Sequence, residues 1–470
     1  MPQGQRQVAT FVIVSLGLFM VTLDNLVVST ALNVIRLDLD ATLAQLEWIV
    51  NAYTLVFAIF LITGAALGDR FGRKRMFLVG VVIFTASSAA AALSSGAGTL
   101  IAARAVQGIG GALIMPLSLV LLSEAFPAER RGAVLGAWSA VAGLGVAAGP
   151  LIGGAIVDGL SWEWIFWVNV PVGLALLPFG WRALTESRGP YDRLDPVGFV
   201  LVSAGLFGIV WGLIRGPSHG WSSTGVLAGL IGGGVLLVGF VLWENRVSMP
   251  MLPMRFYKNR MFATTQLVSL LMYFGLFGVV FLMAQFLQVA QGYSPFEAGL
   301  RTLPWTGVPM IIAPAAGAIA ERVGGGRVMA VGMACMAGGF AYLAAVLTPD
   351  VAYVKMVPGL VGAGVGMGLY FSPVAHTILA SVRREEAGQA AGAHSATREV
   401  GGVFGVAILA TVFATYGGYA SPEDFTDGIV PALWVGAVVV GAGAVAALFI
   451  PREAHEVPET VAVAASPPAA

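Results

Sequence analysis

Charged side chains are scarce in this sequence. Asp, Glu, Lys and Arg make up 11% of its 470 residues, whereas soluble domains carry about 25%. Such a composition excludes an ordinary soluble domain. The formal net charge is zero, so bulk charge gives no reason to expect a nucleic-acid partner.

Cysteine and histidine are scarce as well. The single cysteine, Cys335, excludes an intrachain disulfide framework. No Cys/His spacing typical of zinc occurs, so no metal is expected. The four histidines are scattered, whereas an enzyme in a membrane needs clustered His, Asp or Glu, so no enzyme is predicted. The phosphate-binding motif G-x-x-x-x-G-K-[ST] is missing, so the chain does not use ATP directly and no cofactor is expected.

Apolar residues, by contrast, make up 57% of the chain, and the mean hydropathy is +0.85. A helix that crosses a bilayer needs about 20 predominantly apolar residues. Fourteen stretches meet this requirement, so the sequence predicts an all-α polytopic protein of the lipid bilayer. The predicted spans are 8–35, 45–67, 76–94, 99–125, 132–158, 163–184, 196–215, 223–243, 262–288, 297–319, 328–347, 354–381, 394–416 and 428–450.

The distribution of basic residues orients these spans. Lys and Arg are enriched in the cytoplasmic loops of membrane proteins. Nineteen of the 25 Lys and Arg residues fall on the side of the two termini, and three fall on the opposite side. The sequence therefore predicts that both termini are cytoplasmic. The tryptophan-rich segment 162–167 then lies at the outer interface, where aromatic side chains are common.

Two distant parts of the chain repeat each other. The segment GDRFGRKR (68–75) has a second copy, AERVGGGR (320–327), and glycines 132, 136, 145 and 149 match glycines 388, 392, 401 and 405 at one constant offset. Parallel six-span repeats are typical of one large class of transporters. We therefore predict a half over 1–195, two inserted spans over 196–244, a second half over 245–450 and a disordered cytoplasmic tail over 451–470.

One carboxylate interrupts the first predicted span. Asp24, followed by Asn25, is the only carboxylate found deep in a span of the first half. An ionisable residue at this depth indicates a functional site with a partner. Arg104, inside the fourth span, is the expected partner, and Gln107, one turn on, can hydrogen-bond either residue. The alternative is a buried ion pair of purely structural value.

Four short motifs carry a family resemblance. GAALGDRFGRKR (64–75) resembles the signature loop of the major facilitator superfamily, and RAVQGIGGA (104–112) resembles its fourth-helix motif. GLGVAAGPLIGG (143–154) resembles the fifth-helix motif of drug–proton antiporters. LDNLVVSTAL (23–32) resembles the first-helix motif of the fourteen-span drug:H⁺ antiporters. The resemblance covers about 8–450 and implies a major facilitator fold of 6+2+6 transmembrane helices.

The resemblance implies roles for two of these motifs. The loop after the second span becomes a cytoplasmic gating loop that favours the outward-open state, and the fifth helix becomes a hinge. A topology anchor and plain helix packing are the alternatives. The gating-loop residues are Gly68, Asp69, Arg70, Gly72, Arg73 and Arg75, with Glu321 and Arg322 in the second copy, and the hinge residues are Gly145, Gly149, Pro150 and Gly153.

The family plan places substrate near the midplane between the halves. Asp24 and Arg104 are predicted to carry proton coupling. Several aromatic residues and one histidine are predicted to line the cavity; the alternative for them is plain packing with no contact to substrate. The predicted cavity residues are Asn25, Gln107, Tyr273, Phe277, Tyr370 and His376.

These expectations combine into one function. We expect a monomer in the bacterial cell membrane that exchanges protons for hydrophobic or cationic small molecules by alternating access. A dedicated exporter of one natural product, lipid or metabolite is the alternative. The first-helix motif departs from the family pattern at Leu26, Ser29 and Asn33, and the sixth span does so at Glu163. These departures leave the substrate open.

Overall fold

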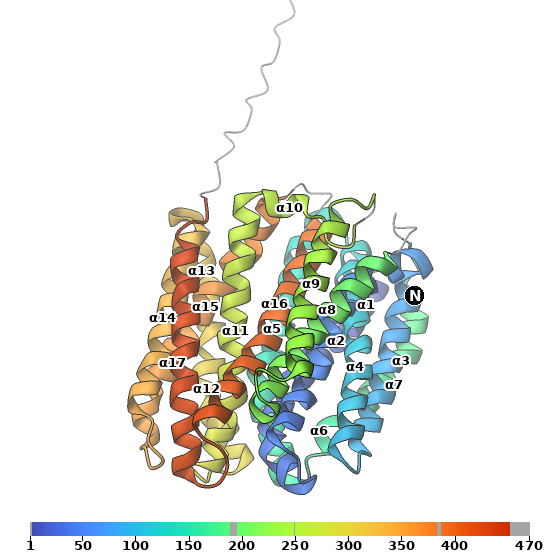
Figure 1. The fold of residues 1–470 in the computed structure, drawn as a ribbon. Coiled ribbons are helices and arrows are strands. Elements are labelled where there is room, and N and C mark those ends of the chain that lie inside the picture. The colour runs from blue at the N-terminus through green and yellow to red at the C-terminus, as the bar shows by residue number, and fades with distance from the viewer. Residues whose placement is uncertain (1, 189–194, 249, 383–386, 452–470) are drawn as a thin grey trace, which may run out of the picture.

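The computed structural model describes residues 2–188, 195–248, 250–382 and 387–451. These residues form helices and no strands, and the long helices run side by side in one bundle (Figure 1). Helix α1 begins and helix α17 ends at the same end of the bundle, which we call the terminal end (top of Figure 1); the opposite end is the distal end. The predicted tail lies outside the described residues from 452 onward.

The helices of the first half gather on one side of the bundle, in blue to cyan in Figure 1. A short helix, α6, precedes α7, and the two together make one span. The helices are α1 (Gln3–Asp38), α2 (Leu43–Phe71), α3 (Arg73–Ala92), α4 (Ala97–Ala125), α5 (Ala128–Gly159), α6 (Trp164–Trp167) and α7 (Asn169–Ala183).

The second half lies on the other side, in yellow to red, and the two inserted helices lie between the halves in green. The inserted helices are α8 (Pro196–His219) and α9 (Thr224–Glu244). The second half comprises α10 (Arg255–Lys258), α11 (Arg260–Val289), α12 (Pro295–Thr306), α13 (Val308–Val323), α14 (Gly325–Val346), α15 (Tyr353–Ala380), α16 (Ala387–Tyr416) and α17 (Pro422–Ala447).

Thirteen helical stretches of the described chain are long and apolar enough to cross a membrane. The predicted fifth span falls on α5, a 32-residue helix, many of whose side chains lie outside the described part. The predicted sixth and tenth spans each consist of two helices, α6 with α7 and α12 with α13. The chain is therefore an all-α multi-pass membrane protein.

Local sequence signals set several helix ends. Thr42 and Gln45 form a capping box at the start of α2, and Ser294 and Glu297 form one at the start of α12. Gly72 ends α2 with φ of 107°, and Gly324 ends α13 with φ of 93°. Only glycine adopts such φ values at little cost. The two copies of the repeated loop thus turn in the same way.

Glycine contacts repeat between the halves. A methyl group added to Gly145 or Gly149 of α5 would come within 3 Å of Thr22 or Leu26 of α1. Added to Gly401 or Gly405 of α16, it would come within 3 Å of Leu270 or Phe274 of α11 in the same way. The closely packed pair α1–α5 therefore has a counterpart in α11–α16. The exact boundaries of the halves stay a prediction.

The inserted helices pack against both halves. Leu206, Val210 and Ile214 of α8 share an apolar cluster with residues of α2 and α16. The α2 members are Leu55 and Ile59, and the α16 members are Val403 and Ala407. Helix α8 therefore covers the seam along which α2 meets α16.

Candidate functional site

The Asp24 side chain is the centre of a buried polar network. Arg104 Nη1, on α4, donates a hydrogen bond to Asp24 Oδ2 and forms an ion pair with it. Gln107 Nε2, one turn along α4, and Asn169 Nδ2, at the start of α7, each donate to Asp24 Oδ1 at 2.9 Å. Asp24 and Arg104 are each only 1% exposed. The pairing predicted between Asp24 and Arg104 is thus present in the structure.

A second layer holds these donors in place. Ser88 Oγ, on α3, accepts from Gln107 Nε2 at 2.8 Å, and Gln107 Oε1 accepts from Arg104 Nη1 at 2.7 Å. The guanidinium of Arg104 lies 4.1 Å from the ring centroid of Tyr53 and 5.7 Å from that of Phe166. Cation–π contacts of this kind strengthen when water is excluded.

This arrangement allows two chemical states. The donors around Asp24 stabilise its ionised form, because a buried carboxylate needs paired charge and hydrogen bonds. A proton on Asp24 would remove the negative charge that holds Arg104. The carboxylate can therefore bind the proton or the guanidinium strongly, but not both.

Sequence reasoning did not select three members of the network: Ser88, Asn169 and Tyr53. Serine is an ordinary packing residue in membrane helices, and Asn169 lies within the predicted sixth span. Its position two residues after the tryptophan-rich segment did not distinguish it from a packing residue. Only the packing of α3 and α7 on α1 and α4 reveals these partners.

Three of the predicted cavity residues gather in an aromatic cluster of the second half. The ring centroid of Tyr273 lies 6.0 Å from those of Phe277 and Tyr370. Tyr370 is fully buried. Asn25 is half-buried, whereas His376 is exposed near the terminal end of α15. Of the six residues, Gln107 belongs instead to the Asp24 network, and substrate contact stays a prediction for all of them.

A second buried ion pair faces the first half. Arg398 Nε and Nη2 donate to Glu399 Oε1 at 2.9 and 2.7 Å, and Glu399 is fully buried. Arg398 also reaches Met115 Sδ of α4 at 3.7 Å and lies 5.7 Å from the ring centroid of Tyr273. Tyr53 lies within electrostatic range of both this pair and the Asp24–Arg104 pair. The two ion pairs therefore face the same tyrosine.

The predicted gating loop forms a compact network within the first half. Arg73 pairs with Asp69 at 2.8 Å and with Glu124 of α4. Glu186, after α7, accepts from the backbone N–H groups of Lys74 at 3.0 Å and Arg75 at 3.2 Å. A carboxylate at this place satisfies the free N–H groups that begin α3.

The other members of the loop have simpler surroundings. Gly68 packs against Leu117 of α4, and a methyl group at Gly72 would meet the Glu186 carboxylate at 2.8 Å. Arg70 is exposed, with its guanidinium 5.2 Å from the Phe71 ring centroid. In the second copy Arg322 is exposed, and the side chain of Glu321 lies outside the described residues. Gating by either loop stays a prediction.

The predicted hinge helix packs on both halves. Gly153 of α5 faces Thr30 and Val27 of α1, and Gly154 faces the backbone of Pro295 in the second half. Gly299 of α12 faces the Pro150 carbonyl in turn. Helix α5 continues through Pro150 without a break. The small residues therefore allow close packing, and hinge motion stays a prediction.

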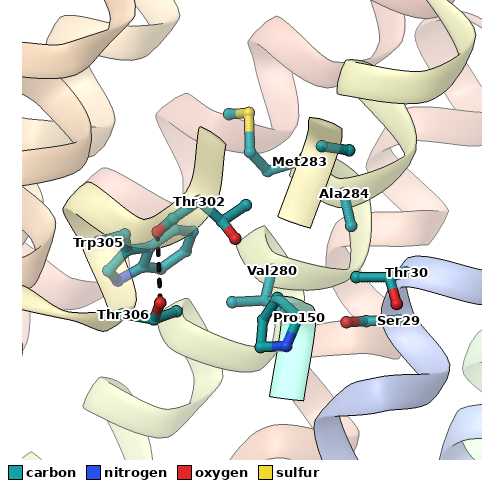
Figure 2. A pocket seen from close by; sticks show the side chains of 10 residues that line it. Ser29, Thr30, Pro150, Val280, Met283, Ala284, Thr302, Trp305 and Thr306 are labelled. Carbon is teal, nitrogen blue, oxygen red and sulfur yellow. Dashed lines mark hydrogen bonds between the residues drawn. The ribbon is translucent and has the colours of Figure 1, made fainter. Parts of the chain in front are cut away.

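The halves are closed against each other at the distal end. Gln288 Nε2 of α11 donates to the Thr30 carbonyl of α1 at 2.8 Å, and Ser294 Oγ donates to Asp158 Oδ2 of α5. A cavity of only about 20 Å³ remains among α1, α5, α11 and α12 (Figure 2), with Ser29 and Thr30 on one side and Trp305 on the other. That volume is close to one water molecule.

A larger cavity of about 410 Å³ lies beside α8 and α9. Its walls are mainly apolar, with Leu206 of α8 and Phe240 of α9 among them. Its polar members are Gln266, Thr397 and Tyr257, of which the first donates to the second at 3.2 Å. Burial raises the pKa of Tyr257, and its hydrogen bonds to Thr397 and Gln266 lower it. The phenol therefore stays a hydrogen-bond donor at neutral pH.

Fold and site together define a class: a multi-pass helical transporter with the Asp24–Arg104 ion pair buried among the helices of its first half. Over residues 14–406, and again over 267–468, the sequence matches the family model of the Major Facilitator Superfamily. The chain belongs to that superfamily, so it is a transporter and not an enzyme.

Similar proteins agree with this assignment. The chain is 35% identical to the tetracenomycin C resistance and export protein of Streptomyces glaucescens, over 98% of this chain and 83% of that one. It is 34% identical to the multidrug efflux pump LfrA of Mycolicibacterium smegmatis, over 93% and 86%. The peptide transporter POT in complex with sulfate has the same fold, with a TM-score of 0.67 and 14% identity over 97% and 100% of the two chains.

Proposed function

We propose that this chain exports hydrophobic or cationic small molecules from the bacterial cell in exchange for protons. The single observation that carries the proposal is the Asp24 carboxylate, buried with Arg104, Gln107 and Asn169 as donors. Similarity to proteins named for antibiotic export and multidrug efflux supports the substrate class. The terminal end, with most of the basic residues, faces the cytoplasm under this proposal, so the distal end faces outward.

The transport cycle follows from the two states of Asp24. The structure is the distally closed conformation in which Asp24 is paired with Arg104. When the distal end opens, a proton from outside displaces Arg104 and removes the charge, and the empty carrier closes again. Opening toward the cytoplasm releases the proton as substrate binds. The electrical gradient supplies about 2.3 kcal/mol per charge per 100 mV.

The test is proton-driven efflux from vesicles that contain the purified protein. We expect an imposed pH gradient to drive efflux of a lipophilic cation dye by the wild type, and Asp24→Asn to abolish it. The matched control is Asp40→Asn, which changes an exposed carboxylate at the distal end of α1. Efflux that survives collapse of the gradient, or an active Asp24→Asn variant, contradicts the proposal.

One alternative substrate class stays open: a single natural product. The name of the Streptomyces relative, which specifies one antibiotic, favours this alternative. It predicts no dye efflux by the wild type but a pH-dependent response to one compound. A panel of natural products that includes tetracenomycin C, tested in the same vesicles, separates the two classes.

A further inference from the structure

Two polar side chains of α2 are buried without partners. Glu47 is 3% exposed and Asn51 is fully buried. Glu47 Oε2 has no hydrogen-bond partner, and neither does Asn51 Nδ2 or Oδ1. Within the described residues Glu47 forms no ion pair. Asp24 stays the only carboxylate found deep in a predicted span of the first half, because Glu47 lies near the start of the span 45–67; the fold buries it nevertheless. A buried carboxyl group without partners calls for an explanation.

Both side chains lie at the seam between the halves. Residues 47, 51, 55 and 59 follow one another at four-residue spacing, so they share one face of α2. On this face Leu55 and Ile59 pack against Val403 and Ala407 of α16. Glu47 and Asn51 continue this face toward the distal end. They therefore lie on or beside the face of α2 that meets the second half.

Tyr419 gives independent support for this position. It follows α16 in the chain, and its electrostatic environment includes Glu47 and Arg36. Burial raises the pKa of Tyr419, Arg36 lowers it and Glu47 raises it. The phenol stays neutral and donates to Gln285 of α11. Glu47 therefore lies beside the contacts that close the distal end.

Three arginines lie on the helices around Glu47, and none of them pairs with it in the part of the chain that the structure describes. Arg36 forms no ion pair there, and its Nε has no hydrogen-bond partner. The Arg36 guanidinium of α1 stacks on the Tyr419 ring, 4.4 Å from its centroid. Arg104 of α4 is paired with Asp24, and Arg398 of α16 is paired with Glu399. Other charged or titratable groups of the neighbouring helices include Asp38, which accepts from Trp162, and Arg215, which stacks on Trp211. His219 and Tyr416, toward the distal end, are exposed, and His394 of α16 contacts Gln266 at 3.1 Å.

We propose that Glu47 is a second proton-binding site, protonated while the distal ends of the halves are closed and ionised when they separate. The inference rests on the proposed alternation between the two conformations. Without an ion pair or a hydrogen-bond donor to Glu47, the closed interface favours the neutral carboxyl group. Separation of α2 from α16 exposes Glu47 to the outer solution, where its charge is hydrated. Asn51, one turn deeper, is hydrated in the same step.

The sign of the effect follows from linkage. The closed state binds a proton at Glu47 more tightly than the open state does. Low outer pH therefore favours the distally closed conformation. This preference is lost as the pH rises through the range in which Glu47 holds its proton in the closed conformation but not in the open one. One proton changes the ratio of open to closed molecules by at most about tenfold per pH unit. A proton from outside thereby promotes return of the carrier to the distally closed state.

The experiment measures the distance between two distal labels as a function of pH. Spin labels are placed at Leu37→Cys of α1 and Tyr416→Cys of α16, both of which are exposed, in a Cys335→Ala background in lipid nanodiscs. In the otherwise unchanged protein we expect the longer distance to gain population as the pH rises. Glu47→Gln is neutral at every pH, so it loses the part of this response that the proton on Glu47 supplies. That part is a change of up to about tenfold per pH unit in the ratio of open to closed molecules. Glu47→Asp keeps the response.

Two controls separate this inference from the proposed function. Asp40→Asn is expected to keep the full pH response. If Glu47→Gln leaves the response unchanged, the second site is disproved even when Asp24→Asn still abolishes dye efflux. A distance that does not change with pH in the parent protein also overturns it, whatever the efflux assay shows.

Discussion

The two halves share a frame but fill its centre differently. Matching glycine contacts show which residues of the two halves correspond. Gly110 of α4 packs on Phe84 of α3 as Gly366 of α15 packs on Met336 of α14. Gly145 of α5 packs on Thr22 of α1 as Gly401 of α16 packs on Leu270 of α11. Counting along the helices from these contacts gives the counterparts of the Asp24 network. Asp24 corresponds to Met272, Arg104 to Leu360, Gln107 to Ala363 and Ser88 to Phe340. The second set is fully buried and apolar.

This difference shows what the duplicated fold requires and what it does not. The second half fills the positions that correspond to the Asp24 network with apolar side chains, so a charge pair at this place is not needed to pack six helices together. The ion pair of the second half, Arg398 with Glu399, lies at other positions, on α16. The first half retains Asp24 and Arg104 although a buried pair is seldom more stabilising than an apolar replacement. The pair is therefore best explained by function.

The largest expected effect comes from breaking the pair on one side. Arg104→Leu introduces the residue found at the corresponding position of the second half, but it leaves the Asp24 carboxylate buried and unpaired. We expect a loss of about 3–5 kcal/mol of stability, measured by unfolding in mixed micelles. The double variant Asp24→Met and Arg104→Leu reproduces the apolar pattern and should recover most of that loss.

The double variant also sharpens the comparison. It should fold and yet carry out no proton-driven efflux. Met272→Leu, a volume-conserving change in the second half, serves as the control and should cost less than about 1.5 kcal/mol. A double variant that is no more stable than Arg104→Leu would show that the first half needs its charges for folding.

A smaller effect is expected where the two repeated loops differ. Glu186 covers the start of α3, whereas the start of α14 packs through Gly326 against Ala447 and Ile450 at the end of α17. Glu186→Ala should cost about 0.5–2 kcal/mol, as the loss of a helix cap does. Hydrogen exchange at the amides of Lys74 and Arg75 should accelerate. Asp350→Ala, at an exposed carboxylate, should leave these amides unchanged.

Much of this architecture was predictable from sequence because lipid imposes a simple rule. Backbone polar groups in a bilayer must be satisfied within helices, so long apolar runs predict the spans. Asp24 and Arg104 were predictable for the same reason, since charge is rare in such runs. The aromatic cluster around Tyr273 was predictable in its residue types but not in its contacts.

Other features depend on packing that the sequence does not encode locally. Glu47 is the third residue of the predicted span 45–67, where a carboxylate normally reaches the interface, and its burial follows from tertiary packing. Asn169 and Ser88 are ordinary polar residues until α3 and α7 bring them to Asp24. Sequence identifies the unusual residue, and the fold identifies its partners.

The central claim is that Asp24 exchanges its proton when substrate binds. The most direct measurement is proton release from the purified protein, followed with a pH-sensitive dye in weakly buffered detergent solution as a lipophilic cation is added. The account predicts release by the wild type and by Asp40→Asn, and no release by Asp24→Asn. Equal release by Asp24→Asn and the wild type would contradict it.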